Sequence, residues 1–491
     1  MARIVVIGAG MGGLAAAARL ATLGHAVTLC EAGPAHGGMV GQYERDGFRF
    51  DTGPTLLTLP AVYRDLMLKT GRTRLEDEVE LRPVDPGSEH VLPDGTRFAL
   101  ANASRAKVLA ELDAKLGTGA GERWGELLER GRGVWEATRR PLLEEPLPED
   151  TAPLHRDPYA PAKRGLFARP PRTLADVARK ELRHDGLAAL LDEYALRFGL
   201  NPETAPASLT VLPYMEQSFG VWYVTGGMRA LADAVLRRCR ARGVELRFDS
   251  PVARVLGEER VTGVLLADGT TLDADVVVAD VDPAMLTRLG VPEDDGTSPE
   301  PSTRSRFVVL LALRGARPEG TPHRTVVHTT DRREELDALA GGYLPTAPTL
   351  EVLRPDDASL HPARHETVSL CAGVPGHGPD AGQLDWQADG QRAAAFAEHL
   401  ITLAERAAPG LRERVLWYEI RTPADLAREH HAAWGAVPGP ALAGGGGAHL
   451  ARRNTTSLPG LYRVGQHAHP GGGLARVGMS ASVTAGLIGP A

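Results

Sequence analysis

The chain has 491 residues, of which 43% are hydrophobic and 24% are charged, so it can bury the cores of two or more domains. Its net charge of −7 gives no support for nucleic-acid binding, and its three cysteines show no paired spacing, which indicates free thiols. No apolar run reaches the roughly 18 residues that a membrane-spanning helix needs. We therefore expect a cytoplasmic protein, while peripheral contact with a membrane stays open.

The N-terminus has the pattern of a dinucleotide-binding unit. Residues 4–7 are β-branched and predict a strand, and Gly8, Gly10 and Gly13 follow at the spacing Gly-x-Gly-x-x-Gly before a helical run. Free amides at the start of such a helix bind phosphates. A second short strand leads to Glu31, whose carboxylate would accept hydrogen bonds from a ribose and would disfavour a 2′-phosphate. The motif therefore predicts FAD or NAD in preference to NADP.

Strand and helix signals follow along the rest of the chain. Hairpin turns are predicted at 93–95 and 267–270, and strands at 98–101, 274–279, 307–313 and 367–373. Helices are predicted at 106–116, 122–138, 173–182, 186–198 and 389–408. Residues 141–171 are rich in Pro and Arg and predict a long loop, with a lid or a membrane-facing edge as the alternative. The glycine run 444–447 does not follow a predicted strand, so we expect a flexible loop there and not a phosphate cradle.

Five further segments carry recognisable motifs. They are the pair Gly37-Gly38, the stretch 48–55 that ends in Asp-Thr-Gly-Pro-Thr, and the segments 220–230, 355–362 and 461–473. Together with the N-terminus they resemble the phytoene desaturase and carotenoid dehydrogenase family of the FAD-dependent amine oxidase superfamily. The resemblance covers both ends and the middle of the chain.

This resemblance implies an α/β fold with a discontinuous Rossmann-like FAD-binding domain, a mixed-sheet substrate domain and a helical subdomain. The implied FAD-binding domain comprises residues 1–75, 215–280 and 451–491. The implied substrate domain comprises residues 76–214, which include the helical subdomain, and residues 281–450.

The resemblance also implies which residues form the site. The segment before Thr55 would pass beside the flavin ring, Gly465 would reach the pyrophosphate, and the last helix would point its N-terminus at the ring, where it would stabilise negative charge. Met39 stands where the superfamily usually has an arginine. His467 and His469 are the expected catalytic residues. The expected cofactor contacts are Gly8, Ala9, Gly10, Gly12, Gly13, Glu31, Ala32, Gly38, Met39, Pro54, Thr55, Val252, Gly465, Gln466, Val477 and Met479.

The implied activity is removal of hydride from a largely apolar substrate, such as an isoprenoid, a polyene or a specialised metabolite, to FAD. The chain has one Gly-x-Gly-x-x-Gly between strand and helix, so we expect electrons to pass to oxygen or a quinone, without a nicotinamide site. Related amine oxidases use a lysine in the later substrate domain, whereas the last lysine here is Lys180. Two alternatives remain: a redox-neutral isomerase of the same family and a non-catalytic prenyl-binding protein of the same fold.

Two local features refine this hypothesis. The pairs His430-His431 and His467-x-His469 lack matching carboxylate or cysteine ligands, so we expect no metal site. His467 and Arg476 stand where the family usually has glycine. These changes favour a substrate shorter or more polar than a full-length carotene, and simple sequence drift is the alternative.

Overall fold

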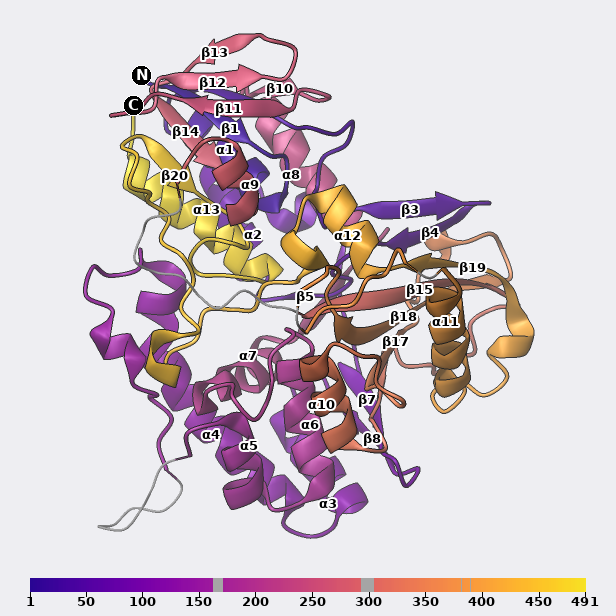
Figure 1. The fold of residues 1–491 in the computed structure, drawn as a ribbon. Coiled ribbons are helices and arrows are strands. Elements are labelled where there is room, and N and C mark those ends of the chain that lie inside the picture. The colour runs from indigo at the N-terminus through magenta and orange to yellow at the C-terminus, as the bar shows by residue number, and fades with distance from the viewer. Residues whose placement is uncertain (162–170, 293–303, 381, 389) are drawn as a thin grey trace.

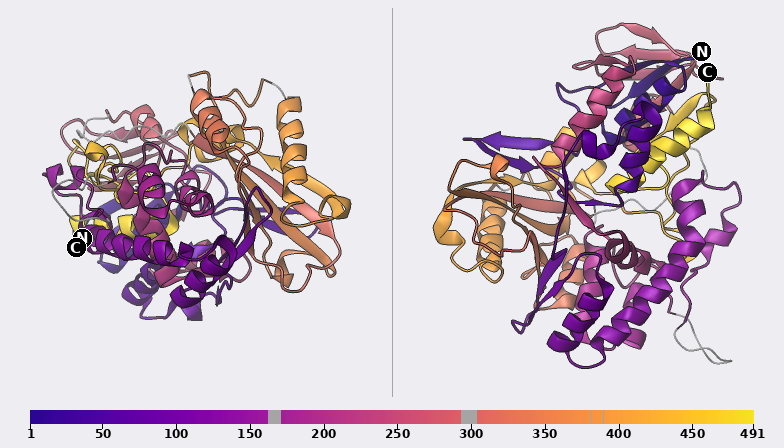
Figure 2. Two further views of the ribbon diagram at one scale, coloured as in Figure 1. Left: turned by 90° about the horizontal axis from the view of Figure 1, so that it is seen from below. Right: turned by 180° about the vertical axis from the view of Figure 1, so that it is seen from behind.

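The computed structural model describes residues 1–161, 171–292, 304–380, 382–388 and 390–491. Both termini lie on one lobe, where the Ala491 amide donates to the Leu23 carbonyl at 3.1 Å (Figure 1). The helices of the middle of the chain lie at the opposite end, and a large sheet packs beside both (Figures 1 and 2). Within the described residues, no helix is both long and apolar enough to cross a membrane.

A five-stranded parallel sheet forms the centre of the first lobe. Its strand order is β10-β2-β1-β14-β20, so three distant parts of the sequence meet in one sheet. The parallel pairs bring residues of the first strand beside both β2 and β14. These strands are β1 (Arg3–Ile7), β2 (Ala26–Cys30), β10 (Glu245–Arg247), β14 (Val276–Ala279) and β20 (Leu461–Arg463).

The two faces of this sheet are covered differently, because side chains alternate along a strand. Ile4 and Val6 belong to one apolar cluster with the helices α1 (Met11–Thr22), α8 (Arg229–Ala241) and α13 (Leu474–Ile488). Val5 and Ile7 belong to another cluster on the opposite face. That cluster includes the small antiparallel sheet β11 (Val252–Leu256), β12 (Gly263–Leu266) and β13 (Thr271–Asp273), and the helix α9 (Pro283–Arg288).

A seven-stranded sheet forms the second layer, in the order β19-β15-β18-β17-β16-β7-β8. All its neighbouring strands are antiparallel except β16 and β7. Helix α11 (Gly390–Ala404) packs on one face, where Phe396 meets Phe307 edge to face. The strands are β7 (Ser88–Val91), β8 (Arg97–Leu100), β15 (Arg304–Arg314), β16 (Arg324–Val327), β17 (Leu350–Leu353), β18 (His365–Pro375) and β19 (Val415–Arg421).

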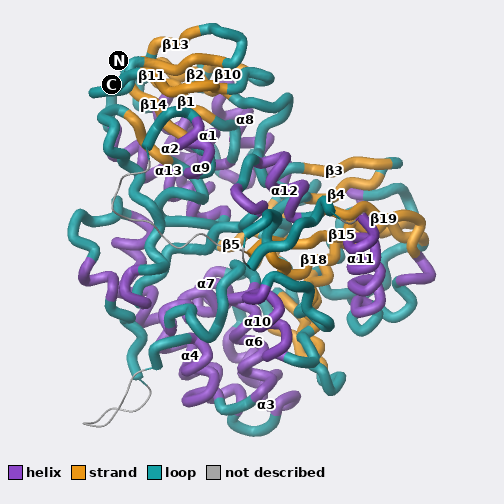
Figure 3. The backbone as a smooth tube through the Cα atoms, viewed as in Figure 1, coloured by secondary structure: helices purple, strands orange, loops and turns teal. Residues whose placement is uncertain are grey.

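A helical subdomain packs around the buried ring of Trp124. Its helices are α3 (Arg105–Leu116), α4 (Ala120–Arg139), α5 (Leu174–Val177), α6 (Asp185–Leu196) and α7 (Val211–Phe219). The other elements are β3 (Gln42–Arg45), β4 (Phe48–Asp51), β5 (Leu57–Thr58), β6 (Leu81–Pro83), β9 (Val221–Val224), α2 (Ala61–Gly71), α10 (Arg332–Gly341) and α12 (Pro423–His430). Figure 3 shows how loops join the helical end to the sheets.

The predicted fold class is confirmed, and the predicted elements are found with shifted ends, while the domain boundaries stay a prediction. Three expectations need correction. The described part of 141–171 contains the 3-10 turn Ala152–His155 and the end of a π-helical turn, Arg140–Glu144. The glycine run contains a 3-10 turn, Gly445–Gly447. The helix expected over 389–408 ends at Ala404, and residues 389 and 162–170 lie outside the described residues.

Candidate functional site

The turn between β1 and α1 is built so tightly that it requires glycine. Gly8 has a φ of +97°, which side chains rarely adopt, and a Cβ on Gly13 would lie 2.0 Å from the Gly8 carbonyl oxygen. The helix therefore begins directly against the end of the strand. Its first amides have no acceptor within the helix and point out of the sheet edge.

Four glycine backbones surround these amides. A Cβ on Gly12 would lie 2.7 Å from the Cα of Gly465, and a Cβ on Gly38 would lie 3.1 Å from the Cα of Gly10. The backbones of the segments near residues 10, 38 and 465 thus approach one another closely, and the Asp280 carboxylate lies against both Gly10 and Gly465. We call Gly10, Gly12, Gly38 and Gly465 the glycine cradle. A cradle of backbone at a helix N-terminus fits a pyrophosphate, which needs close approach of several amides.

Asp280 lies beside this cradle and was not predicted from the sequence. Its carboxyl group accepts the Gly13 amide at 2.7 Å, so an acidic side chain already lies at the start of α1. Burial, together with the nearby charge of Glu31, raises the pKa of Asp280 to about 7. The available signal was its position directly after β14, because ligands of α/β sheets bind at the carboxyl ends of the strands.

Glu31 follows β2 at the same sheet edge. Its carboxylate accepts the Ala9 amide at 2.7 Å and the Gly33 amide at 2.9 Å. A carboxylate offers about four lone-pair positions, so two remain for ribose hydroxyls. The amide of Ser250 donates to the Glu31 carbonyl, which brings the segment before Val252 beside Glu31, and Ala32 lies exposed next to it.

Three of the family-like segments meet at one loop between β9 and α8. The Asp51 carboxylate accepts the Met228 amide at 2.9 Å, at the start of α8. The Asp357 carboxylate accepts the Gly226 amide at 2.6 Å and the Tyr223 hydroxyl at 2.8 Å. Burial raises the pKa of Asp51 to about 7. These motifs therefore have a structural role in positioning this loop, while their contact with a flavin stays a prediction.

The segment before Thr55 also packs on the cradle side. A Cβ on Gly53 would lie 2.0 Å from the Met39 carbonyl oxygen, so the backbones of 39 and 53 touch. Pro54 and Thr55 follow directly and are half-buried. The structure thus brings Met39, Pro54 and Thr55 together, as expected for one side of a shared site.

The C-terminal segment completes the cradle. The Val464 amide donates to the Ala279 carbonyl at 3.0 Å, and the Gly465 amide donates to the Ser480 hydroxyl at 3.1 Å. These bonds hold Gly465 between β14 and helix α13. Val477 and Met479 lie in the first two turns of that helix, and Gln466 follows Gly465 in the turn before it.

The two predicted catalytic histidines have different surroundings. His467 receives a hydrogen bond from the Gln466 amide at its Nε2 atom, 3.2 Å away, and burial lowers its pKa. His469 contacts the Glu145 carbonyl through Nε2 at 3.1 Å, and burial lowers its pKa to about 4. Both rings are therefore neutral at neutral pH. They do not act on one another, and a catalytic role for either stays a prediction.

The parallel sheet, the glycine cradle and the acid after β2 define an enzyme of the dinucleotide-binding class. A family model of flavin-containing amine oxidoreductases matches residues 11–472. The chain therefore belongs to that family, and it is a flavin-dependent oxidoreductase similar to phytoene desaturases, as the sequence predicts.

Two relatives illustrate this similarity. The sequence is 29% identical to 4,4'-diapolycopene oxygenase of a Methylomonas species, over 97% of this chain and 96% of the relative. It is 31% identical to hydroxyneurosporene desaturase of Cereibacter sphaeroides, over 97% of this chain and 95% of the relative. An oxidoreductase structure from Methanosarcina mazei shares the fold, with a TM-score of 0.64, 17% identity and coverage of 98% and 99% of the two chains.

Proposed function

We propose that the protein is an FAD-dependent desaturase that removes hydride from a largely apolar isoprenoid, polyene or specialised metabolite. The observation that carries this proposal is the glycine cradle, set in a chain that matches carotenoid-modifying relatives over nearly its whole length. A non-catalytic prenyl-binding protein would have no need of a backbone cradle at a helix N-terminus.

The chain's own residues would bind and orient the cofactor. The amides at the start of α1 would hold the pyrophosphate, Glu31 would accept from the ribose, and Gly465 would allow close approach from the opposite side. The segment before Thr55 and the first turn of α13 would contact the ring. When bound, a flavin supplies a hydride acceptor for an activated C–H bond.

The protein would contribute orientation and a dry environment more than acid–base chemistry. His467 and His469, the two predicted catalytic histidines, are buried, and burial lowers the pKa of each, so both are held neutral. A neutral imidazole can accept the single proton that leaves the carbon next to the hydride donor, and we assign that role to one of these two residues. Electrons would then leave to oxygen or a quinone, because the chain has a single cradle of this kind in its described residues.

Anaerobic mixing tests the proposal. The purified yellow protein is mixed with a panel of apolar polyenes and shorter functionalised isoprenoids, while the flavin absorbance is followed. We expect bleaching with at least one substrate, formation of a product with one more double bond, and recovery of colour with a quinone or oxygen. A product that is only a double-bond isomer, without net bleaching, would instead establish the redox-neutral isomerase.

A further inference from the structure

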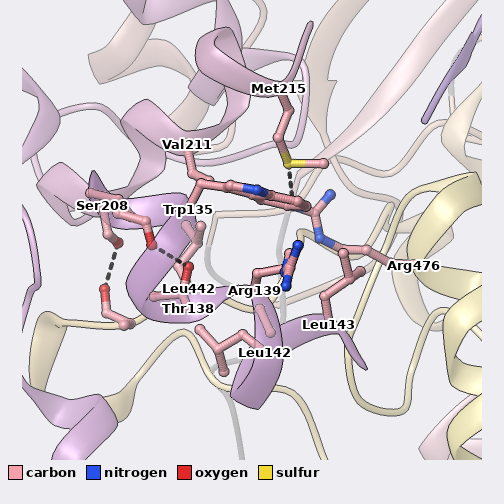
Figure 4. A pocket seen from close by; sticks show the side chains of 13 residues that line it. Trp135, Thr138, Arg139, Leu142, Leu143, Ser208, Val211, Met215, Leu442 and Arg476 are labelled. Carbon is pink, nitrogen blue, oxygen red and sulfur yellow. Dashed lines mark hydrogen bonds between the residues drawn. The ribbon is translucent and has the colours of Figure 1, made fainter. Parts of the chain in front are cut away.

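A pocket lies between the helical subdomain and the first turn of α13. The cavity itself has a volume of about 20 Å³, and with the adjoining space that opens to solvent the empty volume is about 340 Å³. Figure 4 shows its walls, which come from α4 and the π-helical turn after it, from the 3-10 turn Ala207–Thr210 and α7, and from the segment 441–443. Most of the lining is apolar, including Trp135, Leu142, Leu143, Val211 and Leu442.

One charged side chain is buried in this wall. Arg476 is 8% exposed and extends from α13 into the pocket, where its Nη2 atom lies 3.9 Å from the Met215 sulfur (Figure 4). Within the described residues, no carboxylate lies within ion-pair distance of its guanidinium. Burial lowers the pKa of Arg476 to about 10, so the group remains a cation at neutral pH. A buried charge without a counter-ion costs free energy unless a ligand supplies the partner.

The position of Arg476 increases this cost. It is the third residue of α13, where the partial positive charge of the helix N-terminus disfavours a cation, and the first turn of α13 contains no acidic residue. The described residues that line the pocket include two arginines and no carboxylate. The second, Arg139, is exposed and its Nε atom lies 3.3 Å from a Glu144 carboxylate oxygen. The pocket therefore presents one uncompensated positive charge inside an apolar wall.

We infer that this pocket binds the carboxylate end of an otherwise apolar substrate, with Arg476 as its recognition residue. This inference rests on the proposed function, since it names the substrate class of the same site. A guanidinium matches a carboxylate through two parallel hydrogen bonds. A single free guanidinium balances the single charge of a carboxylate, whereas a phosphate monoester would bring nearly twice that charge, and Arg139 already has a partner.

The apolar wall gives the second half of the recognition. Leu142, Leu143 and Val211 would contact the chain next to the carboxylate, and burial of each such side chain favours binding of hydrocarbon. The Thr138 hydroxyl donates to the Val134 carbonyl, so its oxygen offers acceptors and no free proton to the ligand. The pocket thus combines one cation with hydrocarbon, which suits an amphiphilic acid and disfavours a plain hydrocarbon end.

A binding experiment on the flavin-loaded protein tests this inference. The probes are all-trans-retinoic acid and retinol, which share a polyene chain and differ at the end group. Quenching of tryptophan fluorescence reports binding without turnover, because Trp135 lines the pocket. We expect the wild-type protein to bind the acid about 10- to 100-fold more tightly than the alcohol, as charge-assisted hydrogen bonds do. In the variant Arg476→Met this preference should vanish, with retinol binding unchanged.

The control is Arg132→Met, which removes the same charge from an exposed position on α4 outside the pocket. It should keep the preference for the acid. Arg476→Met should keep or raise its melting temperature, because it removes a buried charge that has no counter-ion to lose. Equal binding of acid and alcohol by the wild-type protein, or an unchanged preference in Arg476→Met, would overturn the inference.

Two further outcomes distinguish this inference from a role of Arg476 in cofactor binding and from the proposed desaturation. If Arg476→Met shifts the flavin spectrum or reduction potential of the substrate-free protein and leaves the acid preference intact, the guanidinium serves the cofactor and the inference fails. If the acid preference depends on Arg476 but no acid or hydrocarbon bleaches the flavin anaerobically, the carboxylate site stands and the proposed desaturation fails.

Discussion

At the scale of single residues, the proposed cofactor site depends on glycines, which carry no side chain. Gly13 could not carry a Cβ because the Gly8 carbonyl lies 2.0 Å from its position, so a change there would disturb the fold itself. At Gly10 the nearest atom to an added Cβ is the Asp280 carboxylate, 2.6 Å away, which belongs to a side chain that can move. A substitution at Gly13 would therefore impair folding, whereas a substitution at Gly10 would affect mainly the binding of the cofactor.

The variant Gly10→Val should fold and lose its flavin. The added side chain would fill the glycine cradle, where the pyrophosphate is proposed to lie, while Asp280 moves aside. The flavin-to-protein ratio of the purified protein and its far-ultraviolet circular dichroism measure the two effects. Gly486→Val is the control, because no atom lies within 4 Å of its added Cβ. A Gly10→Val protein with full flavin content would contradict the site assignment.

Glu31→Ala should weaken FAD binding less severely. It removes a charged acceptor for the ribose, which corresponds to about 1.5–3 kcal/mol, and it also frees the Ala9 and Gly33 amides. Titration of the apoprotein with FAD measures the loss. An affinity equal to that of the wild-type protein would show that Glu31 only organises the backbone.

Asp280 should make cofactor binding dependent on pH. Its pKa is about 7 in the folded protein and 3.8 in the absence of burial, so the folded apoprotein retains a proton that the unfolded chain releases. Stability therefore falls as pH rises from about 4 to about 7 and is level above that. Above pH 7 the ionised carboxylate would also repel the phosphates of FAD.

The variant Asp280→Asn removes both effects. Its apoprotein should lose the fall in melting temperature between about pH 4 and pH 7 that this carboxyl causes. Its FAD affinity should stay level from pH 7 to pH 9, whereas that of the wild-type protein should fall by up to about tenfold per pH unit. Parallel pH profiles for the two proteins would show that Asp280 has no such influence.

At the scale of elements, the loop before α8 shows how distant motifs position the site. Asp51, which ends β4, accepts the Met228 amide at the start of this helix, and Asp357 holds Gly226. A Cβ on Gly227 would lie 2.8 Å from an Asp51 oxygen. This close contact explains why glycines stand at 226 and 227, where Asp357 and Asp51 approach from two other segments.

Asp51→Ala should lower stability by about 1–2 kcal/mol, as the loss of a helix-capping acceptor does. Asp51→Asn keeps an acceptor oxygen and removes a buried carboxyl group whose pKa is raised to about 7. At pH 8 the stability of this variant should therefore match or exceed that of the wild-type protein. Melting temperatures of the two apoproteins at pH 8 provide the comparison. Equal losses in both variants would show that the charge, and not the acceptor, stabilises α8.

Local sequence patterns predicted the helices and strands well where apolar residues recur with a clear helical or strand period. The strand, turn and helix around Gly8 follow from β-branched residues and glycine spacing, and the long strands β15 and β18 follow from apolar runs. Helix α7 was missed because Pro213 lies near its start and conceals a helical pattern. Asp280 and the pocket at Arg476 were not predicted as sites, because burial and the lack of a counter-ion depend on tertiary packing.

At the scale of the whole molecule, three chain segments build one parallel sheet and one cradle. Neighbouring strands of the seven-stranded sheet are antiparallel except at the β16–β7 pair, and the other sheets are small and antiparallel. Within the described residues, the five-stranded sheet alone has the strand-helix-strand crossover that binds dinucleotides. Reductases that pass electrons from a nicotinamide to FAD usually carry a second such unit.

Neither NADH nor NADPH should therefore reduce the bound flavin quickly in the absence of oxygen. Glu31 disfavours a 2′-phosphate at the one cradle, and the proposed FAD already fills it. The flavin absorbance is followed after anaerobic addition of either nucleotide, with dithionite as the control that shows the flavin can be reduced. We expect full bleaching by dithionite and none by the nucleotides within the turnover time of the substrate. Rapid bleaching by NADH or NADPH would reveal a second nucleotide site and would make the molecule a reductase.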